Sequence, residues 1–433
     1  MAFPSVSILI TSSFLLLSFF SNALTSPKAF IFPIRKDGAT NQYYTTIQIG
    51  SNATTLNVGI DLGGNFLWFN SLDYFSAADS YRPILCGTNQ CRIANGVGCV
   101  FCFLSPPVPG CTNNTCSDYA LNPFTGTQVY SGLGQDVLRV SSTRATQYEV
   151  KRFPFQFSPY PDFREGLATS TVGLLALGRT RVSLPSQLSS AFKISDKFAL
   201  CIPSSGGNGN MIIGDEVYRK PFQQISEAIQ TTPLLRNPVS NSGNEVVGNL
   251  SIAYFIDVKS IRVGETSLAL NKTLLSINKR TGEGGTSIRT VRAYTSLHRS
   301  IYRAVVDEFV KAAAAKNIKR VASVAPFGAC FDSRTISSSK TGADVPTVDL
   351  VLQSSSVYWR FYGSNSMVRV GDRVMCLAFV EGPPNLSGPT TSIVVGGYQL
   401  ENHLLEFDVS ASKLGFSSTL LLSDTSCNQF GAA

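Results

Sequence analysis

Two acidic residues beside glycine turns are the residues of this sequence best placed to do chemistry. Asp61 ends an apolar stretch and is followed, after one leucine, by two glycines, and Glu283 is followed directly by two glycines and then by β-branched residues. Glycine lets the backbone turn sharply and approach a neighbouring segment closely. Two carboxylates held together by such turns can share one proton, so that one activates a water while the other protonates a carbonyl oxygen.

The surroundings of the two acids are alike, which indicates a duplication. Each acid is followed, at nearly equal distance along the chain, by an apolar run that ends in a small residue, at residues 174–176 and 394–396. Self-similarity of this kind is typical of a chain built from two copies of one structural unit. We therefore expect two halves, each contributing one acid.

The elements that would position these acids are mostly strands. Residues 43–49 alternate between apolar and polar types before a glycine, and residues 55–69 predict the hairpin that carries Asp61. Residues 300–318 have apolar positions at helical spacing followed by four alanines, which predicts a helix. Gly, Ser, Thr, Val and aromatic residues are abundant and charged residues are few, so we expect an all-β fold with a few short helices.

Composition excludes several classes of function. The 433 residues can bury a large core, and the net charge of +8 comes from no Lys/Arg cluster, which argues against nucleic-acid binding and suits an acidic wall polysaccharide. The two histidines, His298 and His403, have no neighbours of metal-ligand type, so we expect no metal and no cofactor.

The N-terminus indicates export from the cell. Residues 8–20 form a short apolar run that ends before small residues, so we expect residues 1–24 to be a removed signal peptide. No later apolar run is long enough to span a bilayer, which predicts a secreted protein without a membrane anchor.

Cysteines and glycosylation motifs agree with secretion. An even number of cysteines in a secreted chain predicts disulfides, and crowding favours a structural role over a redox or zinc pair. Six cysteines cluster and have open pairing: Cys86, Cys91, Cys99, Cys102, Cys111 and Cys116. Five Asn-x-Ser/Thr motifs predict glycosylation sites: Asn52, Asn113, Asn249, Asn271 and Asn385.

Several ordered segments from Phe30 to the C-terminus carry a resemblance to a known family. They are Gly178-Arg179-Thr180-Arg181, Val321-Ala322-Ser323-Val324-Ala325-Pro326, Val348-Asp349-Leu350-Val351-Leu352, Gly363-Ser364-Asn365-Ser366-Met367 and Leu414-Gly415-Phe416. The chain resembles pepsin-like aspartic peptidases, and more closely their plant, non-proteolytic branch. That branch includes extracellular dermal glycoprotein, xyloglucan-endoglucanase inhibitors, cereal xylanase inhibitors and basic 7S globulins.

This resemblance implies a bilobal pepsin-like fold, with one lobe at residues 25–218 and the other at residues 219–433. It also implies disulfides between Cys201 and Cys427 and between Cys330 and Cys376. Active relatives carry a hairpin that closes over substrate, and its counterpart here is the segment at residues 129–140, which keeps a tyrosine, Tyr130, but lacks their Asp-Gly-Ser turn.

The same resemblance predicts a degenerate catalytic pair, with Asp61 in one lobe and Glu283 in the other. Active relatives have a hydroxyl residue after each aspartate, whereas here Leu62 and Gly284 follow the two acids. Misplacing a catalytic group by about 1 Å costs on the order of a hundredfold in rate. We therefore expect no useful peptidase activity.

Binding is the function that remains. The inhibitors that this chain resembles place basic loop residues into the acidic cleft of a glycoside hydrolase, where an arginine can pair with a carboxylate. The family's basic position after the long helix corresponds to Arg320, which could equally be a helix-terminal cation. The other inhibitory loop has no basic residue here, and within it lie Asn385, Leu386 and Ser387.

The sequence thus predicts a secreted protein of the plant apoplast that binds or inhibits a microbial endoglucanase or xylanase. Two alternatives stay open. One is a storage or ligand-binding protein similar to the basic 7S globulins, and the other is a weak, atypical aspartic endopeptidase that uses Asp61 and Glu283.

Overall fold

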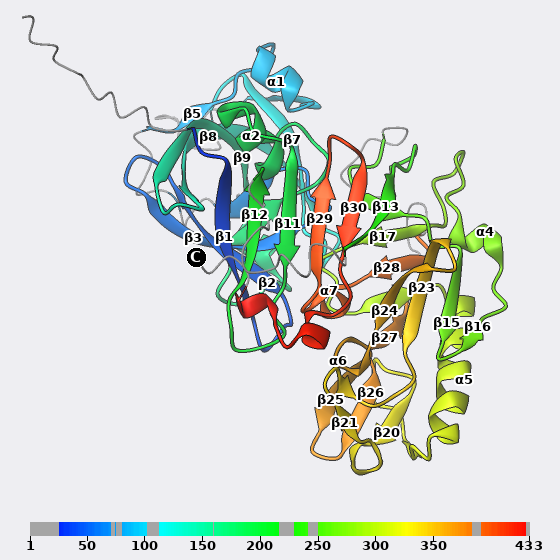
Figure 1. Ribbon diagram of the computed structural model, residues 1–433. Helices are drawn as coiled ribbons and strands as arrows, with labels where there is room; N and C mark the ends of the chain where they lie inside the picture. Colours follow the sequence, from blue (N-terminus) through cyan, green and yellow to red (C-terminus); the bar gives the residue numbers. More distant parts are fainter. Residues whose placement is uncertain are drawn as a thin grey trace, which may run out of the picture.

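Two lobes follow each other along the chain and share a sheet between them (Figure 1). The computed structural model describes residues 26–70, 74, 80–101, 112–158, 160–215, 229–240, 250–382 and 391–429. The predicted signal peptide and the predicted boundary at residues 218 and 219 lie outside these residues. Strands dominate the described residues, and the predicted all-β, bilobal pepsin-like fold with few short helices is confirmed.

The first lobe is built on antiparallel hairpins. Strand β2 (Tyr43–Ile49) pairs with β3 (Thr54–Asp61), and the long β8 (Gln128–Ser142) pairs with β9 (Gln147–Ser158). Side chains of β2 alternate between buried and more exposed positions, as the sequence predicts for a strand with one face on the core. The N-terminal β1 (Ala29–Lys36) joins these hairpins by pairing with β2 and β8.

A three-strand motif in the first lobe holds Asp61. Strand β3 runs parallel to β10 (Gly173–Ala176), and β10 also pairs with the antiparallel β4 (Leu67–Asn70). In this register Leu174 lies opposite both Gly59 and Trp68, and Ala176 lies opposite Asp61.

The second lobe repeats this motif. Strand β17 (Thr286–Ile288) runs parallel to β28 (Ile393–Val395), and β28 also pairs with the antiparallel β18 (Thr295–Leu297). Here Val394 lies opposite both Ser287 and Ser296. The two motifs have the same topology, as expected from the duplication.

The shared sheet joins the lobes through the last strands of the chain. Strand β11 (Lys197–Cys201) pairs with β12 (Gly209–Gly214) on one side and with β29 (Leu404–Asp408) on the other. Strand β29 pairs with β30 (Lys413–Phe416), which pairs with β13 (Gln230–Leu235). Figure 1 shows the red strands β29 and β30 between the green β11 and β13.

The longest helix, α5, covers one side of the second lobe. It spans Arg299–Ala315 and buries Ile301, Val305 and Phe309 against the core. The helix ends three residues before its predicted end, because Asn317 adopts the left-handed conformation with φ 58°. Among the described residues, no helix has both the length and the apolar character needed to cross a bilayer.

Shorter elements complete both lobes. Those of the first lobe are β5 (Arg82–Pro83), α1 (Asn89–Ile93), β6 (Gly98–Val100), β7 (Thr115–Leu121), η3 (Pro161–Arg164) and α2 (Leu184–Phe192). Those of the second lobe are β14 (Tyr254–Ile256), β15 (Ser260–Val263), β16 (Thr266–Ser267), α4 (Lys272–Leu275), β19 (Arg320–Val321), β20 (Cys330–Asp332), η4 (Ser333–Thr335), β21 (Ser338–Ser339), β22 (Gly342–Ala343), β23 (Val348–Ser354), β24 (Val357–Phe361), α6 (Gly363–Ser366), β25 (Met367–Gly371), β26 (Val374–Leu377), β27 (Phe379–Glu381), α7 (Gly397–Leu400), η5 (Leu420–Ser423) and η6 (Cys427–Gln429).

Four disulfides join described cysteines. Their pairs are Cys86–Cys99, Cys91–Cys116, Cys201–Cys427 and Cys330–Cys376. The last two pairs are those that the resemblance implies. The first two lie within the cysteine-rich stretch of the first lobe that begins at Cys86 and ends at Cys116, which we call the disulfide-braced insertion. The other cysteines of the cluster, Cys102 and Cys111, lie outside the described residues.

Candidate functional site

Asp61 lies at the end of β3, almost fully buried between the lobes. The backbone N–H of Gly63 donates a hydrogen bond of 2.8 Å to its Oδ1 atom. Burial raises the pKa of Asp61 above its ordinary value, although the charges of Arg289 and Arg292 and the amides of Gly63 and Gly64 act in the opposite direction. The carboxyl group is thus held in a low-dielectric environment.

The strand registers identify the counterpart of Asp61 in the second lobe. Gly59 and Ser287 occupy equivalent positions in the two motifs. Gly59 pairs with Leu174, which also pairs with Trp68. In the same way, Ser287 pairs with Val394, which also pairs with Ser296. Asp61 is two residues after Gly59, and Arg289 is two residues after Ser287. An arginine therefore stands where the second carboxylate of a catalytic pair would be.

The predicted second acid, Glu283, is wrong for this position. Glu283 lies six residues before Arg289, in an exposed turn that precedes β17, and its Oε2 atom accepts a hydrogen bond from Thr281. The structure therefore does not bring Asp61 and Glu283 together as a pair. The glycines that suggested a catalytic turn, Gly284 and Gly285, instead have positive φ angles that the turn itself requires.

Thr290, the residue after Arg289, supports the site with its hydroxyl group. Its Oγ1 atom accepts a hydrogen bond from the N–H of Leu62 at 3.2 Å and donates one to the carbonyl oxygen of Ile60 at 2.5 Å. The prediction that both supporting hydroxyls are lost is thus wrong for the second lobe. It holds for the first lobe, where Leu62 is buried in the core and cannot return the bond.

The guanidinium group of Arg289 reaches across to the turn of the first lobe. A methyl group at Gly63 would lie 1.3 Å from its Nη1 atom, so any larger residue there would force this arginine side chain to move. Arg292 lies three residues further on; partial desolvation and the charge of Arg289 lower its pKa, and the charge of Asp61 acts in the opposite direction. Asp61 therefore lies within the electrostatic influence of two arginines.

The hairpin of β7 and β8 covers the pocket beside Asp61. Tyr119, on β7, lines this pocket, whereas the expected residue Tyr130 is half-exposed and packs on Tyr119 with ring centroids 5.1 Å apart. At the tip, Asn122 donates hydrogen bonds of 2.8 Å to the carbonyl oxygens of Phe163 and Glu165, which fixes the hairpin to its own lobe.

This pocket is small. Its volume is about 20 Å³, and its walls include Asp61, Trp68, Tyr119 and Arg289. A space of that size holds about one water molecule. This pocket by itself therefore cannot hold the side chain of a peptide substrate.

Among the described residues, one carboxyl group and one arginine occupy the two positions at which aspartic peptidases carry out their chemistry. That chemistry needs two carboxylates that share one proton. An arginine side chain stays protonated and has no acceptor, so Arg289 can neither activate water nor exchange a proton with Asp61. The arrangement instead places the positive charge of Arg289 near the buried carboxyl group of Asp61.

The other predicted site residues lie on the surface or outside the described residues. Arg320 is exposed on β19, and its Nη2 atom donates to the carbonyl oxygen of Gly328 at 3.4 Å. It is not a helix-terminal cation, because α5 ends at Ala315. Of the glycosylation motifs, Asn52, Asn113 and Asn271 are exposed. Asn249 and the loop residues Asn385, Leu386 and Ser387 lie outside the described residues.

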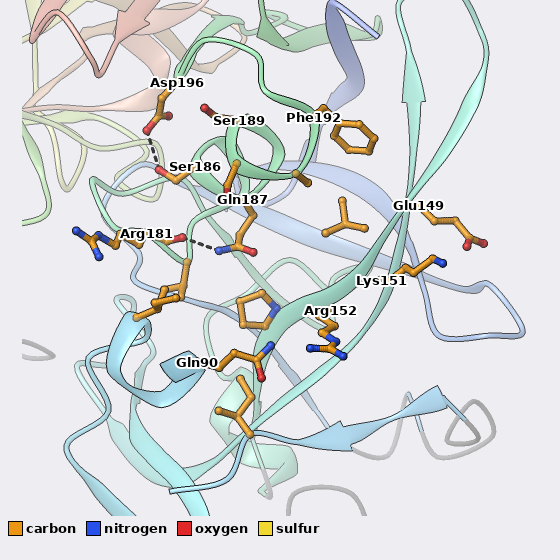
Figure 2. A pocket seen from close by; sticks show the side chains of 17 residues that line it. Gln90, Glu149, Lys151, Arg152, Arg181, Ser186, Gln187, Ser189, Phe192 and Asp196 are labelled. Carbon is orange, nitrogen blue, oxygen red and sulfur yellow. Dashed lines mark hydrogen bonds between the residues drawn. The ribbon is translucent and has the colours of Figure 1, made fainter. Parts of the chain in front are cut away.

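A larger cavity lies in the first lobe, away from Asp61 (Figure 2). Its volume is about 710 Å³, and it lies between β9, α2 and the disulfide-braced insertion. Figure 2 shows Gln187 of α2 and Arg152 of β9 on facing sides, with Gln90 of α1 nearby. Gln187 is already engaged, since its amide donates to the carbonyl oxygen of Arg181. Among the described residues, no group of three or more His, Cys, Asp or Glu side chains is placed to hold a metal.

Two family matches cover most of the chain. Residues 43–215 match the family described as xylanase inhibitor N-terminal, and residues 253–418 match xylanase inhibitor C-terminal. The chain belongs to the xylanase-inhibitor family of pepsin-like proteins. A probable aspartic proteinase GIP2 of Nicotiana benthamiana is 45% identical to it, over 93% of this chain and 92% of that protein. Gamma conglutin 1 of Prunus dulcis is 34% identical, over 93% and 90%.

Solved structures agree with this family. The crystal structure of EDGP matches with a TM-score of 0.88 and 45% identity, over 94% of this chain and 98% of that chain. Basic 7S globulin from soybean matches with a TM-score of 0.78 and 30% identity, over 93% and 99%. An aspartic proteinase from Irpex lacteus, at 12% identity and a TM-score of 0.56, shares the fold alone.

Sequence reasoning missed the residues that interact with Asp61 or its turn, or that line its pocket: Arg289, Thr290, Arg292 and Tyr119. The prediction required an acid at the second position of the pair, so it did not identify an arginine there. One feature of the sequence could have identified the position of Arg289. Arg289 directly follows the short strand β17, and the residue after it, Thr290, carries a hydroxyl group.

Proposed function

We propose that this chain is a secreted, proteolytically inactive member of its family that binds and inhibits a microbial endoglucanase or xylanase in the plant apoplast. The observation that carries the proposal is Arg289 in the place of the second carboxylate. A fold kept without its catalytic pair must act through its surface. Membership in a family named for xylanase inhibition gives that surface its expected partner.

Arg320 is the residue through which we expect the hydrolase to be held. It is exposed, and the residues that follow it lead to Val324, which is 40% exposed. Glycoside hydrolases carry two carboxyl groups in their cleft, and an arginine can bind one with two hydrogen bonds. A projecting cation beside an exposed apolar side chain suits such a target.

The disulfides and the three exposed glycosylation motifs support the secreted state that the signal peptide predicts. The loop at residues 383–392 has no basic residue, so we assign it no inhibitory charge.

The deciding experiment is titration of purified glycoprotein against a xyloglucan-specific endoglucanase and a family of xylanases, with residual hydrolase activity as the readout. We expect inhibition at one-to-one stoichiometry and a loss of about tenfold or more in affinity with Arg320→Ala. Arg303→Ala, an exposed change on α5 that removes the same charge, serves as the matched control.

A second candidate is favoured by the similarity to conglutins and basic 7S globulins. It is a storage or ligand-binding role without inhibition. Absence of inhibition with every hydrolase, before and after removal of glycans, would favour this role. Pepstatin-sensitive cleavage of protein substrates at acid pH, lost in Asp61→Ala, would contradict both candidates.

A further inference from the structure

The larger cavity of the first lobe has the size and the lining of a small-molecule site. Its volume is about 710 Å³, and ligand pockets measure about 300–1,000 Å³. Its apolar lining comes from the disulfide-braced insertion, from β9 and from α2 with the turn before it: Ile84, Ile93, Val150, Pro154, Val182 and Phe192. A ligand that enters this cavity can therefore remove apolar surface from water on both sides of the contact.

A β-bulge in the hairpin of β8 and β9 brings two cations to this cavity. Lys151 and Arg152 of β9 stand opposite the single residue Val137 of β8, because the register of the pair shifts between Asp136 and Leu138. Neighbouring side chains of a regular strand point to opposite faces, whereas a bulge changes the direction of a side chain. Both cations line the cavity, and Figure 2 shows them on its β9 side.

These two cations are available to a ligand. Both side chains are exposed, and neither charged group forms a hydrogen bond or an ion pair within the part of the chain that the structure describes. The acids of the lining are already engaged: Glu149 forms an ion pair of 3.3 Å with Arg139, and Asp196 accepts a hydrogen bond of 2.9 Å from Ser186. Burial also raises the pKa of Asp196, which reduces its negative charge. A carboxylate on the ligand would supply the missing partner, and an arginine can bind it with two hydrogen bonds.

Two glutamines of the lining provide hydrogen-bond acceptors. The Nε2 atom of Gln90 donates to the Oε1 atom of Gln135, and that of Gln187 donates to the carbonyl oxygen of Arg181, both at 2.6 Å. The Oε1 atoms of Gln90 and Gln187 accept no hydrogen bond from any described residue. A hydroxyl group of a ligand could donate to either oxygen. The guanidinium group of Arg181 points away from the other labelled side chains in Figure 2, so we leave it out of the site.

We propose that this cavity binds a hydroxylated aromatic carboxylate, with Lys151 and Arg152 on its carboxylate and Gln187 accepting from its hydroxyl group. The ring lies against the apolar lining, to which Phe192 contributes an aromatic face. A fatty acid suits the site less well, because its hydrocarbon chain would cover the two amide oxygens without offering a donor. The site does not rest on the inhibition proposed above, since Arg320 lies on β19 of the other lobe.

The test is equilibrium dialysis of the full mature glycoprotein with 4-hydroxycinnamate. We expect one molecule to bind per chain. Arg152→Met should weaken binding by about tenfold, the effect of one charge-assisted hydrogen bond. The matched control is Arg303→Met, which removes the same charge from the exposed surface of α5 and should leave binding unchanged.

A second pair of variants tests the cavity without changing its charge. Ala191 is exposed on α2 and lines the cavity, so Ala191→Trp should fill the space and block binding without entering the core. Ala314→Trp, at an exposed position of α5, adds the same side chain elsewhere and should leave binding unchanged.

Ligand analogues test the two polar contacts. Methyl 4-hydroxycinnamate lacks the charge and should bind at least about tenfold more weakly, and cinnamate lacks the hydroxyl group and should bind about threefold or more weakly. The assignment is overturned by absence of 4-hydroxycinnamate binding, by equal binding of the ester, by equal losses in the two arginine variants or by undiminished binding to Ala191→Trp. Tighter binding of dodecanoate than of 4-hydroxycinnamate would also overturn it, in favour of a fatty-acid site.

Discussion

Arg289 occupies in the second lobe the place that Asp61 occupies in the first, at the same register of the same three-strand motif. The replacement inverts the charge at a position where peptidase chemistry needs a carboxylate. It also fills the space above Gly63 with a guanidinium group. One residue therefore takes the place of the second carboxyl group and also adds a positive charge near Asp61.

Arg289→Asp should make the fold sensitive to pH. The change places a second carboxyl group beside Asp61, whose pKa is already raised by burial, and like charges raise it further. A raised folded-state pKa stabilises the protein at acid pH and loses that contribution as pH rises. Between acid and neutral pH, we expect the free energy of unfolding of Arg289→Asp to fall by about 1.4 kcal/mol or more beyond the fall in the unchanged protein.

Urea unfolding across this pH range measures the effect. Arg303→Asp on the exposed face of α5 is the matched control, and Glu283→Gln should behave as the unchanged protein, since Glu283 is exposed. If the difference in free energy of unfolding between Arg289→Asp and Arg303→Asp does not change with pH, the carboxyl group introduced at position 289 does not interact with Asp61.

Thr290→Val should destabilise the protein at every pH. Its buried hydroxyl bonds to the N–H of Leu62 and the carbonyl oxygen of Ile60, and the isosteric valine leaves both groups without this partner. Unsatisfied buried polar groups cost about 1–3 kcal/mol each. Chemical denaturation at neutral pH measures the change, with the exposed Thr281→Val as control; equal stabilities of the two variants would refute the role of Thr290.

Glu401 should give the protein a further dependence on pH. It joins the lobes by accepting hydrogen bonds of 2.6 Å from both Lys36 and Tyr43, and burial raises its pKa from 4.5 to about 7, against the effects of these two residues. Because the folded-state value is the higher one, the stabilising contribution is complete below about pH 4.5 and is lost as pH rises through about 7. The loss is on the order of 3 kcal/mol.

Glu401→Gln should flatten the free energy of unfolding between these pH values, as followed by urea titration. Asp118 also has its pKa raised to about 7 by burial, so the comparison is made in an Asp118→Asn background. An unchanged slope in the double variant would mean that Glu401 does not titrate in this window.

Removal of the disulfide between Cys201 and Cys427 should cost more than removal of the one between Cys330 and Cys376. The first closes a sequence separation of 226 residues and the second one of 46. Loop-closure entropy predicts a difference of about 1.4 kcal/mol between the paired alanine variants. Equilibrium unfolding of the two variants measures it, and the reverse order would contradict the entropic explanation.

The sequence predicted the fold of this molecule better than the residues of its candidate site. Alternating strands, the Asp61 turn and the family motifs identified the fold, because burial and backbone turns leave patterns in residue type. Glu283 failed because an acid beside glycines fits both a catalytic turn and an ordinary tight turn. Only the pairing of β17 with β28 identified Arg289 as the counterpart of Asp61. That pairing joins segments more than a hundred residues apart in the sequence.

The sheet shared by both lobes affects how the protein is made. Strand β11 of the first lobe needs β29 as its neighbour, and Cys201 needs Cys427, so the first lobe stays incomplete until the final residues have been synthesised. Domains that fold as units can fold while the ribosome is still working. Here β11 keeps one open edge throughout translation, and an open strand edge favours association with other chains. We therefore expect strong dependence on chaperones during synthesis and aggregation of any chain that terminates before β29.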